Sequence, residues 1–226
     1  MTEPSQASYK KDLIQYAMEV DALKYGSFTL IAGRTSPYFF NSGLMCTGPI
    51  LATLAAAYAS TIAQALKDGS LPEFDILFGM AYKGIPFASN AAVALYSQHG
   101  ISVSVAYNRK EVKDHGEGGI MVGEPVKGKR VVILDDVMTS GKTIHGAIET
   151  IRQNGGEVVG VIHALDRQEV GQDGVSSAVK VIEGLIGEGR VFSILTMTDL
   201  MIWLERKGLV KELESLQAYW DQYGLK

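Results

Sequence analysis

The amino-acid sequence predicts an α/β fold, a doubly wound and mostly parallel sheet with helices on both faces, plus a small cap built from the N- and C-terminal segments. Apolar runs alternate with helical patterns from residue 51 to residue 197, which is typical of a parallel sheet. The runs are continuous, as in Val131–Leu134, which favours strands buried on both faces. Polar residues follow several of these runs directly, where α/β sheets bind ligands.

Composition and charge narrow the class of protein. The chain has 226 residues, of which 46% are hydrophobic and 20% charged; this suits a globular enzyme with one large domain. The net charge of −4 disfavours nucleic acid as a partner. Cys46 is the only cysteine, which excludes an internal disulfide and zinc-finger spacing. Because no signal segment and no apolar run of membrane-spanning length is found, we expect a cytoplasmic protein without a membrane partner.

The first hundred residues are expected to hold one hairpin and three helices around a buried strand. In order, these elements are an amphipathic helix over 13–23 ending near Gly26, an irregular hairpin over 28–40, a helix over 51–66, a strand over 74–78, a glycine-bracketed loop over 79–86 and a helix that begins near Pro86. The loop holds one lysine, Lys83, just after the strand. An isolated lysine is more often a solvated surface residue, but its place at a strand end favours a functional role.

The second half continues the alternation. The expected elements are a strand over 102–107, a polar loop over 108–119, the strand and loop over 131–143, a helix ended by Gly155 and Gly156, a strand over 157–166, a turn over 168–174, a helix through 175–182, a strand over 191–197 and helices over 200–205 and 210–220. We expect a single domain over residues 1–226. Its core spans about 50–197, and its cap combines about 8–45 with C-terminal helices over 198–223.

The stretch Val131–Thr143 is the centre of the expected site. Four apolar residues run into Asp135 and Asp136, and a loop of small hydroxyl-bearing residues opens the next helix. Backbone N–H groups at such a helix start can bind one phosphate, helped by the helix dipole. Two neighbouring carboxylates suit sugar hydroxyls or Mg²⁺. The stretch therefore indicates a site for a phosphorylated sugar.

Several other nucleotide and metal motifs are excluded. The Gly141-Lys142-Thr143 sequence resembles the end of a P-loop, but the first glycine of that motif is replaced by Asp136, whose charge would repel nucleotide phosphates. The four histidines lack paired metal-ligand spacing. Neither a dinucleotide-binding glycine pattern nor a Gly-x-Ser-x-Gly elbow is found in the sequence.

Cations and aromatic residues elsewhere complete the candidate set. The loop 108–119 concentrates Arg109, Lys110, Lys113 and His115 among acids and glycines, so we expect it to be mobile when no ligand is bound. Such loops are usually solvated surface, but this one could close over a polyphosphate. Phe39-Phe40 suits core packing as well as a wall for a planar ring. With Arg167, these groups could hold a sugar phosphate, a pyrophosphate and a planar anion.

These residues carry a resemblance to a known family. Val131–Thr143 resembles the 5-phosphoribosyl-1-pyrophosphate (PRPP) motif of type I phosphoribosyltransferases, which is specific for the superfamily but not for the substrate. Four further stretches resemble the orotate phosphoribosyltransferases within it. They are Gly33–Asn41, Ala81–Pro86, Asn108–Gly119 and Leu165–Glu169. The similarity covers roughly residues 9–206.

The resemblance implies transfer of a phosphoribosyl group from PRPP to N1 of orotate, giving orotidine 5′-monophosphate and pyrophosphate in pyrimidine (UMP) biosynthesis. It also implies a type I phosphoribosyltransferase-like fold, a requirement for Mg²⁺ and a homodimer in which the loop 108–119 reaches the neighbouring subunit. Mg²⁺ is expected chiefly on pyrophosphate oxygens and water, without a strong direct protein ligand; Asp135 or Asp136 is the candidate if one exists.

Roles known for residues of the family are carried over only to the positions of this sequence that match the family's motifs. The resemblance implies PRPP contacts from Tyr82, Lys83, Arg109, Lys110, Lys113, His115, Asp135, Asp136 and the stretch Val137, Met138, Thr139, Ser140, Gly141, Lys142 and Thr143. It implies orotate contacts from Phe39, Phe40, Thr139 and Arg167. The expected catalytic residues are Lys113, Asp136 and Lys83. A non-proline cis peptide is expected at Ala81–Tyr82.

The chain departs from the family's usual residues at three positions, and two alternative functions are disfavoured. Ile31 stands where the family often has a lysine that reaches toward PRPP, and Ser140 and Lys142 replace small residues. Lys142 either adds charge near the phosphate or faces solvent, which we favour. A purine phosphoribosyltransferase is disfavoured by Arg167 and the Phe39-Phe40 pair, which suit a small anionic pyrimidine. A non-catalytic PRPP sensor is disfavoured because the chain retains all four cations of the loop.

Overall fold

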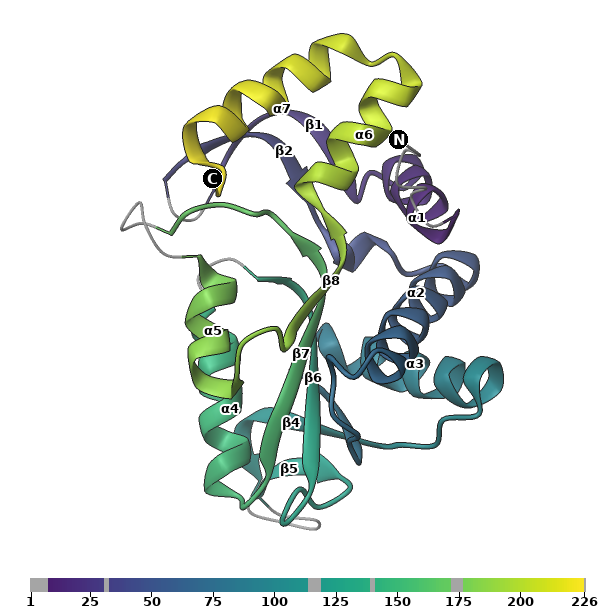
Figure 1. Cartoon of the computed structure of the whole chain (residues 1–226), viewed down its shortest axis with the longest axis vertical. Coiled ribbons are helices and arrows are strands. Elements are labelled where there is room, and N and C mark those ends of the chain that lie inside the picture. The colour runs from purple at the N-terminus through teal and green to yellow at the C-terminus, as the bar shows by residue number, and fades with distance from the viewer. Residues whose placement is uncertain (1–7, 31–32, 114–118, 139–140, 172–176, 226) are drawn as a thin grey trace.

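The computed structural model describes residues 8–30, 33–113, 119–138, 141–171 and 177–225, and its centre is a six-stranded sheet (Figure 1). The strands lie in the order β5-β4-β3-β6-β7-β8, all parallel except β5, which is antiparallel at the edge. Their bounds are β3 Ile76–Gly79, β4 Ser104–Lys113, β5 Gly119–Gly123, β6 Arg130–Met138, β7 Glu157–Asp166 and β8 Val191–Thr196. The expected α/β class with a mostly parallel sheet is confirmed.

Helices cover both faces of this sheet (Figure 1). On one face lie α2 (Gly48–Lys67) and α3 (Gly84–His99), and on the other lie α4 (Lys142–Gln153) and α5 (Ala178–Ile186). Residues along β6 alternate between two buried clusters: Val132 and Leu134 join the α2–α3 side, whereas Val131 and Ile133 join the α4–α5 side. This explains the continuous apolar run, because every side chain of the strand faces a layer of helices.

The remaining elements gather beyond the carboxyl ends of the strands, as α6 follows directly on β8 (Figure 1). They are α1 (Ser8–Glu19), β1 (Leu23–Thr29), β2 (Thr35–Phe40), the short 3₁₀ helix η1 (Ser42–Leu44), α6 (Met197–Lys207) and α7 (Val210–Tyr223). The strands β1 and β2 form the expected irregular antiparallel hairpin. Helices from the two ends of the chain pack together here, since α1 contacts α6 and α7 contacts β2. We refer to this group of elements as the cap.

Two expected element boundaries differ from the structure. The first helix ends at Glu19 rather than near Gly26, because Asp21 takes a left-handed conformation (φ 59°) and Leu23 pairs with Phe40 as a strand. Asn108 and the residues after it do not begin an irregular loop: β4 continues to Lys113 and pairs with β5. In both places sheet pairing decided the backbone conformation against the local pattern.

Helix α2 also corrects an expectation. It is 20 residues long and apolar enough to cross a membrane by length and composition alone, whereas no apolar run of that length was expected. Buried residues of α2, among them Leu54, Tyr58 and Ile62, belong to the large core cluster. A buried helix between a sheet and another helix is apolar for that reason, so its composition is explained by packing.

Candidate active site

Asp136 lies at the end of β6 and is held by groups from two other elements. Ser42 Oγ donates to Asp136 Oδ2 at 2.6 Å, and Lys83 Nζ donates to the same oxygen at 2.9 Å. Burial alone would raise the pKa of Asp136, but the hydrogen bonds from Ser42 and Lys83 outweigh it and keep that pKa below its ordinary value. Asp136 is therefore a carboxylate with a cation beside it.

The neighbouring Asp135 has the opposite environment. Burial raises the pKa of Asp135 to about 7, and the charge of Asp136 acts in the same direction. The backbone is fixed here as well, because Tyr58 of α2 donates its buried hydroxyl to the carbonyl of Asp135 at 2.6 Å. The two aspartates thus differ in protonation near neutral pH, so that one is an ionised acceptor and the other can also donate.

The loop between β3 and α3 brings Lys83 to this strand end. The peptide Ala81–Tyr82 is cis, as expected. Gly84 lies against the next strand so closely that an added Cβ would stand 2.7 Å from the carbonyl oxygen of Leu134. This explains a glycine after Lys83: only a residue without a side chain lets the loop pass close to β6. From β4, Asn108 Oδ1 accepts a hydrogen bond from the Ala81 N–H at 3.1 Å.

The phosphate-type loop after β6 is described only in part. Thr139 and Ser140 lie outside the described residues. Gly141 precedes α4 with φ 71°, and the side chains of Lys142 and Thr143 are exposed. Met138 is buried in the core, and Val137 packs against the other core cluster. Contacts of Val137 and Met138 with a ligand would therefore involve their backbone atoms.

Two cations of the segment 108–119, Arg109 and Lys110, lie on strand β4 of the β4–β5 hairpin. Lys110 Nζ stands 4.9 Å from the centre of the exposed Tyr82 ring, which brings it to the Lys83 loop. Arg109 Nη1 donates to the Gly119 carbonyl at 3.3 Å across the hairpin. The backbone of Lys113 ends β4, whereas its side chain and all of His115 lie outside the described residues.

The cap contributes aromatic residues and a buried arginine. Phe39 is 41% exposed and packs against Phe28 with ring centres 5.6 Å apart, whereas Phe40 is partly buried against the core. Arg167 follows β7 and is buried; its Nη2 donates to Ser36 Oγ at 2.9 Å and its Nε donates to Glu169 Oε1 at 2.7 Å. Phe39 therefore suits a ring wall better than Phe40, and Arg167 is held in place by the cap.

Three residues around the site were not singled out from sequence. Ser42 and Tyr58 hold the aspartates from positions 94 and 77 residues away, and Asn108 holds the Lys83 loop from β4. Ser42 directly follows the Gly33–Asn41 stretch, which was a usable signal. No sequence signal marked Tyr58, because it occupies one position of the apolar face of α2 and resembles an ordinary core residue.

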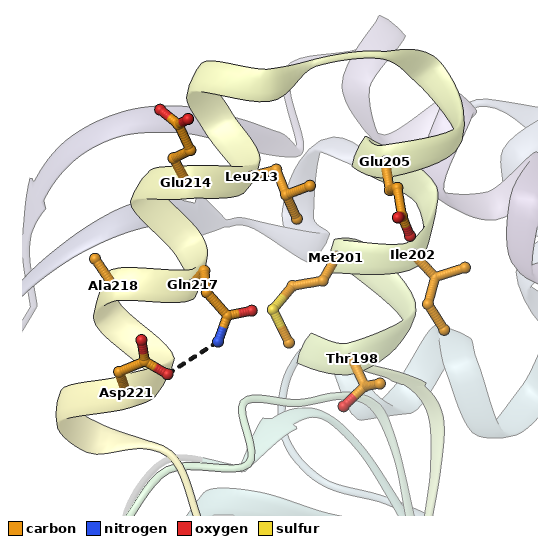
Figure 2. A pocket seen from close by; sticks show the side chains of 9 residues that line it. All are labelled: Thr198, Met201, Ile202, Glu205, Leu213, Glu214, Gln217, Ala218 and Asp221. Carbon is orange, nitrogen blue, oxygen red and sulfur yellow. Dashed lines mark hydrogen bonds between the residues drawn. The ribbon is translucent and has the colours of Figure 1, made fainter.

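Two cavities in the cap do not include the aspartate pair or Lys83. The first, about 560 Å³, is a groove between α6 and α7 in which Met201 and Leu213 face each other (Figure 2). Its lining includes the carboxylates of Glu205, Glu214 and Asp221 and no basic side chain, so its charge is wrong for a phosphorylated or anionic ligand. Among the described residues, no group of three or more His, Cys, Asp or Glu side chains could form a metal cage.

The strand-end acids, the adjoining lysine and the glycine-opened helix are the features that the resemblance to phosphoribosyltransferases implied. Residues 49–192 match the phosphoribosyl transferase domain family, and the chain belongs to that family. The crystal structure of orotate phosphoribosyltransferase from Francisella tularensis superposes with a TM-score of 0.81 at 33% identity, covering 95% of this chain and 100% of that one.

Full-length relatives narrow the family further. The chain is 47% identical to orotate phosphoribosyltransferase of Aeromonas salmonicida over 223 residues, which is 96% of this chain and 99% of the relative. It is 45% identical to orotate phosphoribosyltransferase of Acinetobacter baumannii over 225 residues, with full coverage of both. The chain therefore belongs to the orotate phosphoribosyltransferases.

Proposed function

We propose that the chain transfers the phosphoribosyl group of PRPP to N1 of orotate and releases pyrophosphate, as the names of its relatives indicate. The product is orotidine 5′-monophosphate, on the route to UMP. The observation that carries this proposal is the contact of Lys83 with Asp136 at the end of β6, beside Asp135. It joins a cation suited to pyrophosphate and carboxylates suited to ribose hydroxyls at one point.

The strand-end residues have complementary tasks toward PRPP. Asp136 accepts hydrogen bonds from a ribose hydroxyl, and Asp135 serves the adjacent hydroxyl as acceptor or donor. The loop from Val137 to Thr143, with Thr139 and Ser140 among its members, holds the 5′-phosphate at the start of α4. We assign the pyrophosphate to Tyr82 and Lys83, so PRPP would span two neighbouring strand ends. Binding requires Lys83 to exchange its contact with Asp136 for a phosphate oxygen.

Breaking the bond between ribose and pyrophosphate develops positive charge on the sugar and negative charge on the leaving group. Fixed cations at the leaving group stabilise that transition state more than the ground state. Lys83 supplies one such cation. We assign the main one, and a proton for the leaving group, to Lys113, with Arg109, Lys110 and His115 in support. When bound, Mg²⁺ supplies further charge neutralisation on the pyrophosphate oxygens, with Asp135 or Asp136 as its candidate protein ligand.

Orotate is placed in the cap. In this proposal the exposed ring of Phe39 forms a flat wall for the pyrimidine, the partly buried Phe40 supports the strand from the core side, and Arg167 binds the carboxylate of the base. Thr139 completes the contacts from the phosphate loop. Since the nucleophilic nitrogen must approach the ribose carbon that carries pyrophosphate, the cap and the strand ends act on one substrate pair held between them.

We further propose a cytoplasmic homodimer in which the segment 108–119 of one subunit covers the site of the other. Two exposed apolar side chains on α3 support an interface, since Val93 and Tyr96 are 69% and 68% exposed. Closure of the segment would exclude water, which could otherwise hydrolyse the activated sugar.

The decisive assay follows the near-ultraviolet absorbance of orotate with PRPP and Mg²⁺. We expect the absorbance to fall as orotate is consumed, and no turnover with adenine, guanine or hypoxanthine in its place. Turnover of a purine base without consumption of orotate would overturn the proposed substrate. No turnover of any base, in a protein that binds PRPP, would favour a non-catalytic sensor.

The role of Lys113 and the sharing of the lid can be tested together. We expect Lys113→Ala to lower kcat by roughly 10²-fold, whereas Lys127→Ala, an exposed lysine outside the segment, leaves it unchanged. An equal mixture of Lys113→Ala and Asp136→Asn subunits should recover about a quarter of wild-type activity, because half the dimers are mixed and each holds one complete site. A mixture no more active than its parents would refute sharing between subunits.

A further inference from the structure

Glu169 lies between two arginines of the cap. Its Oε1 accepts from Arg167 Nε at 2.7 Å, and its Oε2 lies 3.8 Å from Arg34 Nη1. The side chain of Glu169 is only 13% exposed, so its charge is largely removed from water and needs these partners. Two arginines and one glutamate leave one net positive charge in the group, which favours an anionic ligand over a neutral one.

The guanidinium of Arg167 is fixed on several sides. Glu169 holds its Nε, Ser36 Oγ accepts from its Nη2 at 2.9 Å, and the ring of Tyr38 lies 4.3 Å from its central carbon. Both Ser36 and Tyr38 are fully buried. Since a guanidinium is planar with donors in a rigid fork, holding two nitrogens and one face determines where the third nitrogen, Nη1, points.

The segment that carries Glu169 is itself held from outside. Its neighbour Val170 donates its N–H to the carbonyl of Tyr223 at 2.9 Å, and Leu225 donates its N–H to the carbonyl of Gln168 at 2.9 Å. Gln168 has a left-handed conformation (φ 50°), which persists in a non-glycine residue only when surrounding contacts enforce it. The C-terminal segment Tyr223–Leu225 therefore forms a short antiparallel pair with the residues that follow Arg167.

Arg34 joins the segment around Glu169 to the C-terminal segment Tyr223–Leu225. It donates from Nη1 to the carbonyl of Val170 at 2.8 Å and from Nη2 to that of Gly171 at 2.7 Å, and its guanidinium lies 4.7 Å from the centre of the Tyr223 ring. These contacts lie on both sides of the bridge between Glu169 and Gly224, because Val170 and Gly171 follow Glu169 and Tyr223 precedes Gly224. The cap hairpin, the segment after β7 and the end of α7 are thereby joined at one point.

We propose that Glu169 is a positioning residue for orotate, and that the segment Tyr223–Leu225 keeps Glu169 in place. Resting on the proposed function, the inference assigns recognition of the anionic base to a group of residues rather than to Arg167 alone. Glu169 aims Arg167 Nη1 at the carboxylate of the base, and Arg34 compensates the charge of Glu169. A neutral pyrimidine such as uracil gains nothing from this arrangement.

Variants of Glu169 test the proposal. We expect Glu169→Ala to raise the KM for orotate by roughly 10- to 100-fold, with kcat and the KM for PRPP each changed less than about threefold, since no reacting group is removed. Glu169→Gln should recover part of the loss because its amide oxygen can still accept from Arg167 Nε. If Glu169 only lowered the local charge, both variants would bind orotate more tightly than wild type. An unchanged or lowered KM for orotate therefore overturns the proposal.

The C-terminal contact can be tested without changing any charge. Leu225→Pro removes the N–H that binds Gln168, and the preceding Gly224 (φ −70°, ψ 151°) already has a conformation that proline tolerates in its neighbour. Leu225→Ala is the matched control, since it shortens the side chain but keeps the N–H. We expect the KM for orotate to rise at least about threefold more in Leu225→Pro than in Leu225→Ala.

Equal KM values in the two Leu225 variants would overturn the role of the C-terminal segment, even if Glu169→Ala did not fold. Wild-type turnover of orotate, measured in parallel, separates this outcome from failure of the proposed function. A wild-type protein inactive on orotate refutes the function and the inference with it, whereas an active wild type with insensitive Glu169 variants refutes the inference alone.

Discussion

Two of the ion pairs in the described part of the chain belong to the candidate site, and they differ in the exposure of the cation. At the strand ends, Lys83 meets Asp136 with the side chains 53% and 17% exposed. In the cap, Arg167 meets Glu169 with the side chains 8% and 13% exposed. The distances are similar, at 2.9 and 2.7 Å, so the difference lies in the surroundings and not in the contact itself.

The comparison indicates which pair can change during a reaction. Because Lys83 is exposed and Ser42 also holds the carboxylate, the strand-end pair contributes about 0–1 kcal/mol, so a substrate phosphate can take Lys83 from Asp136 at little cost. Removing one partner of a buried pair costs about 3–5 kcal/mol, because the other charge is left without compensation. The strand-end pair is therefore suited to exchange partners with PRPP, and the cap pair is suited to hold a fixed geometry for the base.

Removal of Lys83 should have a larger effect than any other substitution at these two pairs. We expect Lys83→Ala to lower kcat by about 10²- to 10³-fold, since it deletes a fixed cation at the leaving group. Its Tm should stay within about 2 °C of wild type, because an exposed pair contributes little stability. Steady-state kinetics and calorimetry measure both, with the exposed Lys67→Ala as the control. A large fall in Tm with kcat retained would place Lys83 in the structure rather than in the reaction.

A smaller effect is expected from Ser42, which holds Asp136 in position. Ser42→Ala removes the donor at 2.6 Å, so we expect the KM for PRPP to rise about threefold to tenfold and stability at neutral pH to fall by about 1 kcal/mol. Because this hydrogen bond helps keep the pKa of Asp136 low, its loss should move the acid limb of the activity profile to higher pH. Ser215→Ala, whose hydroxyl donates only within α7, is the matched control. A pH profile that superposes on wild type would contradict this role.

The smallest predicted effect concerns stability and Asp135. Its pKa is raised from 3.8 to about 7 by burial, so between these values the unfolded chain is ionised while the folded one keeps its proton. This group therefore lowers stability as pH rises from about 4 to about 7, with the full loss present above that range. We expect Asp135→Asn to raise Tm more at pH 8 than at pH 4, by a few degrees, as measured by calorimetry. An equal difference at both pH values would show that folding does not raise the pKa of Asp135.

Much of the architecture could be predicted because it is written in local patterns. The strand predicted over 157–166 has the same bounds as β7. Its largely apolar run lies between two glycines and a polar turn, so both ends are marked in the sequence. The first helix was misjudged at its end, and the segment after Asn108 was expected to be a loop. In both cases the deciding contact was a strand partner, Phe40 for Leu23 and Met121 for Asn108, which local periodicity does not contain.

Short motifs with tight spacing were enough to indicate the family, to single out the aspartate pair and Lys83 as site candidates and, through the resemblance, to predict the cis peptide. How these groups are held depends on contacts that only the folded structure contains. Ser42 reaches Asp136 across 94 residues, and Arg34 reaches Val170 across 136. Such contacts depend on how the cap packs on the strand ends, and the free energy of that packing is spread over the whole core rather than over any one motif. The PRPP motif could therefore be recognised from the sequence. The residues proposed to select the base, Arg167, Glu169 and Arg34, could be grouped only once the fold was known.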